Sequence, residues 1–199
     1  MAVILHMPSA FDRFSREGQI IGRMVIEYGA MEWDFCMLVS AVTGDESAAV
    51  KVMYRARGEQ QRIDLGDALA RDRVPVDVRQ RFEQCVADVH VCRKIRNRYA
   101  HAQWVDTVGM GLAFVDLEAL AEGNEPIDLH KAPYYGLDLA LIEDEQRFFV
   151  GSFQNLRYLN MQARAIREAR DLPDVHYVDP LLRPRKPALI DLLAISLES

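Results

Sequence analysis

The amino-acid sequence predicts an all-α protein: a helical bundle with a small β-hairpin insertion and an extended C-terminal arm. Half of the 199 residues are hydrophobic and 27% are charged, which is typical of a globular chain with a core of its own. Apolar residues recur at helical spacing over several long segments. Two short β-prone stretches flank a pair of glycines, and four of the eight prolines follow residue 170.

The first long helix has Ser9 or Ser15 as its candidate N-cap. Its apolar side chains fall at alternating steps of three and four, in a seam of three heptads: Ile21, Met24, Tyr28, Met31, Phe35, Leu38 and Val42. Such a seam forms either the domain's own core or a dimer interface. We expect the helix to end at Thr43-Gly44-Asp45, where Asp45 can cap a short helix that extends to about Tyr54.

Two more helices precede the predicted insertion. The third helix runs from Glu59 to Asp72, and Val74-Pro75 follows it. Because the residue before a proline avoids helical geometry, the chain is expected to break there. The fourth helix then runs from Val76 to about Tyr99, with one apolar face.

A hairpin is expected directly after the fourth helix. Gln103–Thr107 and Leu112–Leu117 are short apolar stretches on either side of Gly109-Met110-Gly111. The segment from Ala121 to Tyr135 contains one glycine, one asparagine and two prolines, so it is predicted to be a loop. Residues 102–135 together form the predicted insertion.

The last long helix starts near Asp138, and Pro173 is expected to terminate it. This organisation gives one helical domain over residues 9–170 and a proline-rich tail over residues 171–199. The tail finishes with the apolar segment Ala188–Leu197. That segment either docks on a partner chain or folds back on its own domain.

Composition limits the function classes. A net charge of −6 argues against a protein that coats nucleic acid through bulk electrostatics, although Arg79–Arg98 holds six basic and two acidic residues. Three cysteines without a CxxC pair indicate a reducing compartment rather than a disulfide scaffold. No apolar run approaches the ~20 residues of a membrane helix, so we expect a cytoplasmic protein without a membrane partner.

The segment Arg96-Asn97-Arg98-Tyr99-Ala100-His101, at the end of the fourth helix, carries the clearest chemical signal. Asn97 and His101 are four residues apart and are therefore neighbours on a helix. Arg96 points about 140° away from His101 on a regular helix. The two meet only if the helix ends early or if a second chain contributes. An Arg, a His and an amide at one phosphate can polarise it, position it and move a proton.

This segment resembles the motif of the HEPN superfamily, the "higher eukaryotes and prokaryotes nucleotide-binding" domains. Arg96 and Asn97, followed after three residues by His101, match its pattern of Arg, a polar residue, a short spacer and His. The preceding long helix with Glu32 and the two shorter helices are also similar to the family. The resemblance covers roughly residues 15–170, with the hairpin as a decoration.

The resemblance implies a metal-independent endoribonuclease that acts as a homodimer, in which the motif helices of both chains form one composite site. His101 would be the general base or acid, Arg96 would hold the phosphate, and Asn97 would orient the phosphate or the histidine. The substrate would be RNA, because the nucleophile is the ribose 2′-hydroxyl. No metal and no cofactor is expected. Such proteins act as toxins or in defence, with an antitoxin or a regulatory protein as a further partner.

Other residues are candidates for substrate binding. Lys94 and Arg98 belong to the basic stretch, and Tyr99 and Trp104 can either stack on a base or pack the helix end against the hairpin. Glu32 is a candidate partner for an arginine of the motif, with a surface carboxylate as the alternative.

A second interpretation of the motif stays open. Arginine, asparagine and histidine are also suited to capping the last carbonyls of a helix. The chain would then be a non-catalytic HEPN-like interaction module or a nucleotide-binding module.

Overall fold

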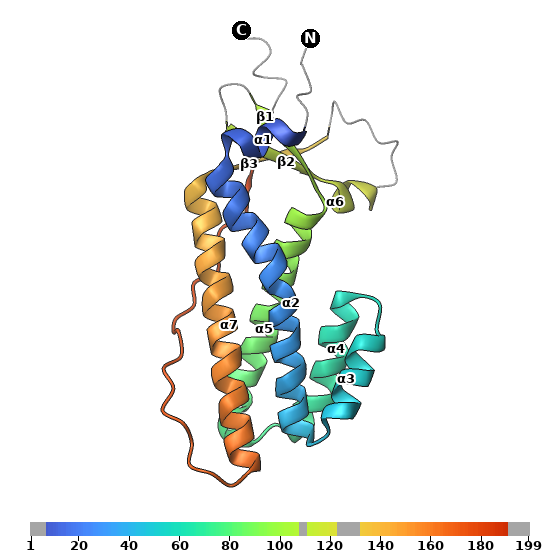
Figure 1. Ribbon diagram of the computed structural model, residues 1–199, viewed down its shortest axis with the longest axis vertical. Coiled ribbons are helices and arrows are strands. Elements are labelled where there is room, and N and C mark those ends of the chain that lie inside the picture. The colour runs from blue at the N-terminus through green and yellow to red at the C-terminus, as the bar shows by residue number, and fades with distance from the viewer. Residues whose placement is uncertain (1–6, 108–110, 123–131, 191–199) are drawn as a thin grey trace. The chain divides into compact units, whose positions relative to one another are not determined.

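The computed structural model describes residues 7–107, 111–122 and 132–190 (Figure 1). This part of the chain is mostly helical and contains one four-stranded antiparallel sheet, so the predicted helical class is confirmed in its coarse form. The chain divides into two compact units. The sheet unit consists of the described parts of Met1–Val25, Arg96–Gln146 and Arg183–Ser199. The helical unit consists of Ile26–Ile95 and Arg147–Leu182.

The described elements follow one another in a simple order. The helices are α1 (Met7–Arg13), α2 (Ser15–Thr43), α3 (Glu46–Arg55), α4 (Glu59–Ala70), the 3₁₀ turn η1 (Arg71–Arg73), α5 (Val76–Ala100), α6 (Leu117–Ala121) and α7 (Leu139–Arg167). The strands are β1 (Ala102–Thr107), β2 (Gly111–Asp116), β3 (Tyr134–Leu137) and β4 (Ala188–Ile190).

The predicted helix ends are confirmed where local sequence signals are strong. Helix α2 ends before Gly44, whose φ of +79° lies in the left-handed region that favours glycine. The Asp45 carboxylate caps α3 by accepting a hydrogen bond from the Ala48 N–H at 2.9 Å. Val74, which precedes a proline, is extended and separates η1 from α5.

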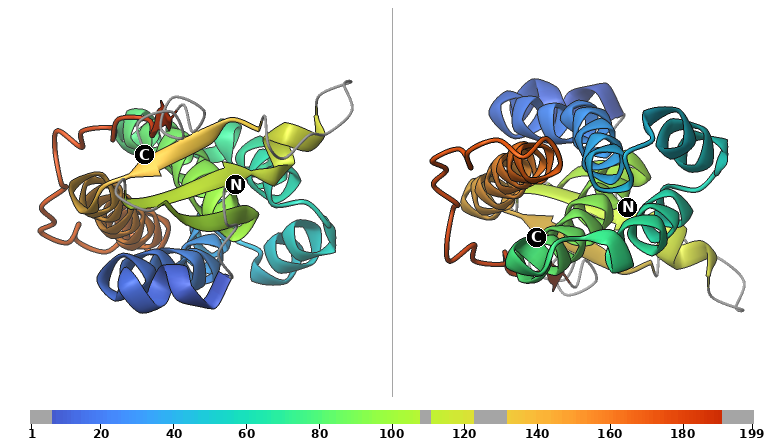
Figure 2. Two further views of the ribbon diagram at one scale, coloured as in Figure 1. Left: turned by 90° about the horizontal axis from the view of Figure 1, so that it is seen from above. Right: turned by 90° about the horizontal axis from the view of Figure 1, so that it is seen from below.

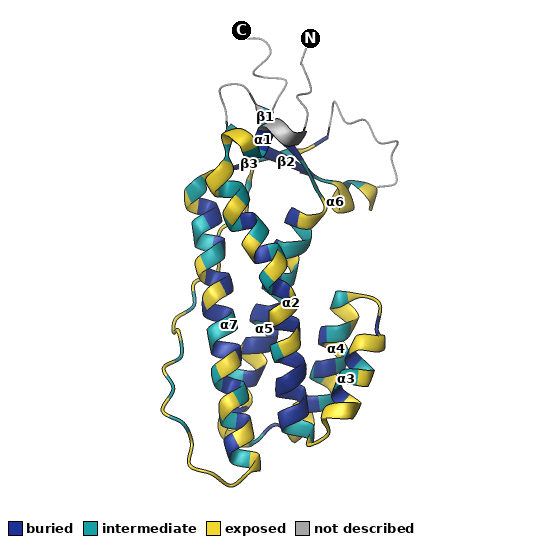
Figure 3. Cartoon of the chain, viewed as in Figure 1, coloured by how far each residue is buried: buried dark blue, intermediate teal, exposed yellow. Residues whose placement is uncertain are grey.

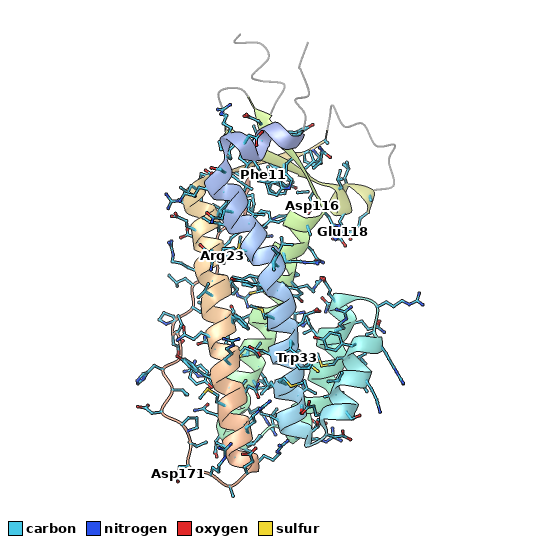
Figure 4. All side chains as sticks on the ribbon, viewed as in Figure 1. Phe11, Arg23, Trp33, Asp116, Glu118 and Asp171 are labelled. Carbon is cyan, nitrogen blue, oxygen red and sulfur yellow. The ribbon has the colours of Figure 1, made fainter. Side chains whose placement is uncertain are left out.

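The sheet unit is built around strands in the order β1-β2-β3-β4, which lie side by side in the view from above (Figure 2). The predicted hairpin is confirmed as β1 and β2, although Gly109 and Met110 lie outside the described residues. Trp104 on β1 is opposite Phe114 on β2, which in turn is opposite Tyr135 on β3. Helix α1 adds Phe11, whose ring centroid lies 5.1 Å from that of Trp104 (Figure 4).

The C-terminal tail supplies the fourth strand. Tyr134 of β3 pairs with Ile190 of β4 in an antiparallel register. A Cβ on Gly136 would lie 2.8 Å from the Ile190 Cδ1, so this glycine allows the tail to approach the strand closely. The fold-back alternative is therefore confirmed for Ala188–Ile190, while 191–197 lie outside the described residues. The predicted tail is divided between the two units, because its residues 171–182 belong to the helical unit.

The helical unit has its core on α2, as the buried lower half of this helix shows (Figure 3). The seam residues of this unit are buried except the half-buried Val42, and Ile21 and Met24, which belong to the sheet unit, are buried as well; this burial favours the core alternative over a dimer interface. Helices α3 and α4 pack on one another. A Cβ on Gly66 of α4 would lie only 2.6 Å from the Phe35 ring, so the helix approaches α2 through a glycine.

Helix α7 begins as expected, since the Asp138 carboxylate accepts a hydrogen bond from the Leu141 N–H at 2.7 Å. Its end differs from the prediction. The helix stops at Arg167, and Ala169 has a φ of 50°, so the chain leaves the helix before Pro173 is reached. None of the helices in the described residues combines the length and the apolar character that a membrane span requires.

Candidate functional site

The candidate motif lies at the junction of α5 and β1, within the sheet unit. Helix α5 ends at Ala100 and β1 begins at Ala102, so His101 is the single residue between them. Its backbone N–H donates to the Asn97 carbonyl at 3.0 Å, which extends helical hydrogen bonding through His101. The early helix end that the sequence left open is therefore not found. Asn97 and His101 are on one face of the helix, and Arg96 projects from the helix about 140° away.

The Arg96 side chain reaches back toward this face. Its Nη1 donates a hydrogen bond to Oδ1 of Asn97 at 3.0 Å, and both residues are half-buried. A guanidinium is a planar cation whose paired N–H groups match the oxygens of a phosphate.

Arg98 and Tyr99, in the same turn, have a different role. Both donate hydrogen bonds to Glu145 of α7, Arg98 from Nη2 and Tyr99 from its hydroxyl. Glu145 is only 1% exposed. Burial raises its pKa above the ordinary value, against the opposing influence of Arg98 and of both hydrogen bonds. This buried cluster joins the last turn of α5 to the first turns of α7. Arg98 therefore stabilises the fold here and is not exposed for contact with a substrate.

Tyr99 and Trp104 are buried in an aromatic cluster of the sheet unit. Their ring centroids lie 5.7 Å apart, and Phe114 lies 6.2 Å from Tyr99 and 5.6 Å from Trp104. Tyr99 is 3% exposed and Trp104 5%. Their burial favours the alternative in which they pack the helix end against the hairpin, because a stacked base needs an open ring face.

His101 itself is exposed and lines an open depression of about 530 Å³. The remaining lining residues are Ala100, Ala102, Leu117 and Glu118. Glu118 is fixed by the start of α6, where the Asp116 carboxylate accepts a hydrogen bond from the Glu118 N–H at 3.1 Å (Figure 4). The depression therefore brings a histidine and a glutamate to one surface, next to the partly exposed Leu117.

Two further candidates lie in the helical unit. Lys94 is exposed on α5. Glu32 is buried, which excludes the surface-carboxylate alternative, and it accepts hydrogen bonds from Arg62 at 2.9 and 3.3 Å. Arg98, one of the arginines considered as its partner, binds Glu145 in the sheet unit.

Metal-ligating side chains and thiols form no second candidate site in the part of the chain that the structure describes. Within residues 7–107, 111–122 and 132–190, no group of three or more His, Cys, Asp or Glu side chains is arranged to hold a metal ion. Cys36, Cys85 and Cys92 are free and buried, as expected for core thiols. Burial raises their pKa to about 11 for Cys36 and about 12 for the other two, so they are poor nucleophiles.

Sequence reasoning missed Glu145 and Glu118. Glu145 had a detectable signal: it occupies a position of the apolar stripe of α7, between Ile142 and Phe149, where a carboxylate is out of place unless it is paired. Glu118 had none, because its place beside His101 depends on α6, a helix too short to be predicted from periodicity.

Comparisons of the chain with protein-family models, with curated proteins and with solved structures found no match.

Proposed function

We propose that the chain is a HEPN-type, metal-independent endoribonuclease that acts as a homodimer. The observation that carries this proposal is the arrangement of the motif side chains at the end of α5. His101 is exposed at the end of α5 and lines an open depression, while the Arg96 guanidinium is held on the neighbouring Asn97 amide. These groups supply a proton carrier, a cation for a phosphate and an orienting amide, which together are what cleavage of a phosphodiester requires.

The proposed reaction begins at the ribose 2′-hydroxyl of RNA. The imidazole of His101 takes the hydroxyl proton as the 2′-oxygen attacks the adjacent phosphorus. The bond from phosphorus to the 5′-oxygen breaks, and a protonated imidazole returns a proton to the leaving oxygen. The products are a 2′,3′-cyclic phosphate and a 5′-hydroxyl end. Arg96 offsets the charge that develops on the phosphate, and Asn97 orients the phosphate or the histidine.

The geometry of the helix supports the proposed dimer. Because helical hydrogen bonding extends to His101, the backbone of one chain directs Arg96 and His101 away from each other. The reaction moves one proton from the 2′-hydroxyl to the leaving oxygen, which a single imidazole can relay and two imidazoles can share as base and acid. A second motif helix facing the first would provide both the second histidine and a further arginine. In a cell, such a nuclease needs control, and we propose an antitoxin or regulatory protein as its partner.

A second function, a non-catalytic interaction or nucleotide-binding module, is favoured by one specific observation. Glu118 lines the same depression as His101, and its negative charge would repel a phosphate bound there. The cation of Arg98 is already paired with Glu145. In this alternative, the depression accepts a basic group of a partner molecule, and the Arg96–Asn97 pair completes the helix end.

RNA cleavage in the presence of excess chelator separates the two functions. Wild type is compared with His101→Ala and with His176→Ala, a control at a histidine whose side chain is 89% exposed on the tail. We expect cleavage by wild type and by the control, and a loss of about 10²- to 10⁴-fold in His101→Ala, since this is the usual contribution of a general acid or base. Equal background cleavage by all three proteins would refute the nuclease and favour the interaction module.

A further inference from the structure

The tail segment Tyr177–Leu181 is bound on the surface of the helical unit rather than simply running past it (Figure 1). Asn155 of α7, which is only 6% exposed, clamps its backbone. The Asn155 amide nitrogen donates to the Val178 carbonyl at 3.0 Å, and its amide oxygen accepts from the Val178 N–H at 2.8 Å. A buried amide that satisfies both polar groups of one residue recognises extended backbone in the way that a neighbouring strand does.

Side chains on either side of Val178 are also recognised. The Nη2 of Arg81 on α5 binds the Asp179 carboxylate at 2.8 Å, and the same guanidinium lies 4.6 Å from the ring centroid of Tyr177. The Tyr177 hydroxyl donates to Gln162 of α7 at 2.7 Å. One arginine thus contacts both an aromatic and an acidic side chain. These side chains are two positions apart, which is the spacing on one face of an extended segment.

The apolar side chains of the segment pack against a glycine of α7. A Cβ on Gly151 of α7 would lie 2.6 Å from the Leu181 Cδ1 and 3.4 Å from the Val178 Cγ1, so both side chains approach the helix where it has no side chain. Beside this contact, the helices and the segment enclose a cavity of about 340 Å³. It is lined by Gln80, Arg81, Gln84, Asp88, Asn155 and residues 178–181. The surface therefore combines hydrogen bonds to the backbone of the segment, an ion pair and an apolar contact.

We propose that this surface is a peptide-binding site, the tail groove, defined by Arg81, Gly151, Asn155 and Gln162. It recognises an extended segment with the pattern aromatic, apolar, Asp, Pro, Leu. The chain's own Tyr177–Leu181 occupies it, and the partner that fits is the same segment of a second copy of this chain.

The connector before the segment makes exchange between copies possible. The backbone N–H groups of residues 168–170 are hydrogen-bonded to the last turns of α7, whereas residues 171–176 are exposed apart from two half-buried positions. These six residues span up to about 20 Å when extended, at 3.3–3.6 Å per residue, which lets the segment reach a molecule packed beside the helical unit. Exchange would also join two copies without any contribution from the candidate motif, so the tail groove does not depend on the proposed nuclease.

A labelled peptide that spans residues 174–183 tests the tail groove by fluorescence anisotropy. Three full-length proteins are compared: wild type, a tail variant (Tyr177→Ala with Asp179→Ala), and the tail variant with Asn155→Ala added. We expect the peptide to bind the tail variant at least tenfold more tightly than wild type, because the tethered tail competes at an effective concentration in the millimolar range. Adding Asn155→Ala should weaken binding at least tenfold.

Controls make either outcome decisive. A peptide with both tail substitutions should not bind, and Arg81→Gln replaces Asn155→Ala if the latter fails to fold by circular dichroism. Mixing the tail variant with Asn155→Ala protein that keeps a wild-type tail should give a 1:1 complex by light scattering. The proposal is overturned if the peptide binds wild type and the tail variant equally, if neither groove substitution weakens binding, or if the mixed proteins do not associate.

Discussion

Replacing Glu145 with alanine gives the sharpest test of how the candidate site is held. The side chain of Glu145 is 1% exposed and that of its partner Arg98 is 19% exposed, so the pair is largely shielded from water. Removing the carboxylate leaves the Arg98 cation and the Tyr99 hydroxyl without their common partner. Breaking a buried pair in this way typically costs about 3–5 kcal/mol. At about 2–4 °C per kcal/mol for a chain of this size, the melting temperature should fall by roughly 6–20 °C.

Helix α7 provides the matched control two residues earlier. Glu143 binds Arg16 at 2.5 Å, but those side chains are 32% and 66% exposed, so Glu143→Ala should cost no more than about 1 kcal/mol. Thermal unfolding of both variants is followed by circular dichroism, and urea unfolding gives the free energies. If Glu145→Ala is no more destabilising than Glu143→Ala, the buried cluster does not hold the end of α5, and the reasoning fails.

Three further predictions concern stability. Burial lowers the pKa of His90, so stability should fall as the pH drops through the ordinary histidine value of about 6.5; urea unfolding at pH 7.5 and 5 should show a smaller loss in His90→Gln. Gly66→Ala should cost about 1–3 kcal/mol in the same assay, since its Cβ would meet the buried Phe35 ring at 2.6 Å; no loss would contradict that packing. Trp104→Ala should cost about 3–5 kcal/mol and quench most of the near-ultraviolet dichroism; an unchanged spectrum would place the indole outside the aromatic cluster.

The sequence predicted those parts of the fold that depend on local signals. Gly44 and Asp45 mark the end of one helix and the start of the next, and Pro75 marks the break before α5. These residues act through their own backbone preferences or through side chains a few positions away. Periodicity in the seam of α2 also identified its buried side, because that spacing reports a helix face directly.

Strands β3 and β4 were missed because their pairing is not local. Tyr134–Leu137 is a short strand that gains its hydrogen bonds from β2 on one side and β4 on the other. The partner β4 lies more than fifty residues further along the chain. The end of α7 was misplaced for a related reason: a proline limits how far a helix can extend, but the helix stopped earlier, near Ala169 with its positive φ.

The candidate site could be predicted only in part. The spacing of Asn97 and His101 fixed their common face, since the helical hydrogen bonding of α5 continues to the His101 N–H, one residue past the end of the helix. The roles of Arg98 and Tyr99 depended on Glu145, which lies more than forty residues away in the sequence and meets them only in the folded sheet unit. Glu118 likewise comes to the depression of His101 through the placement of β2 and α6.

A subunit-mixing experiment tests the central claim most directly, namely that Arg96 and His101 of two chains form one site. Arg96→Ala and His101→Ala are purified separately, shown to be folded and dimeric, and allowed to exchange subunits. RNA cleavage is then measured with excess chelator. We predict that each variant alone is at least 10²-fold less active than wild type, and that the mixture recovers activity well above either parent, because the mixed dimer keeps one arginine and one histidine. Mixed dimers that form but cleave no faster than their parents, or a wild type that does not cleave RNA, would contradict the account.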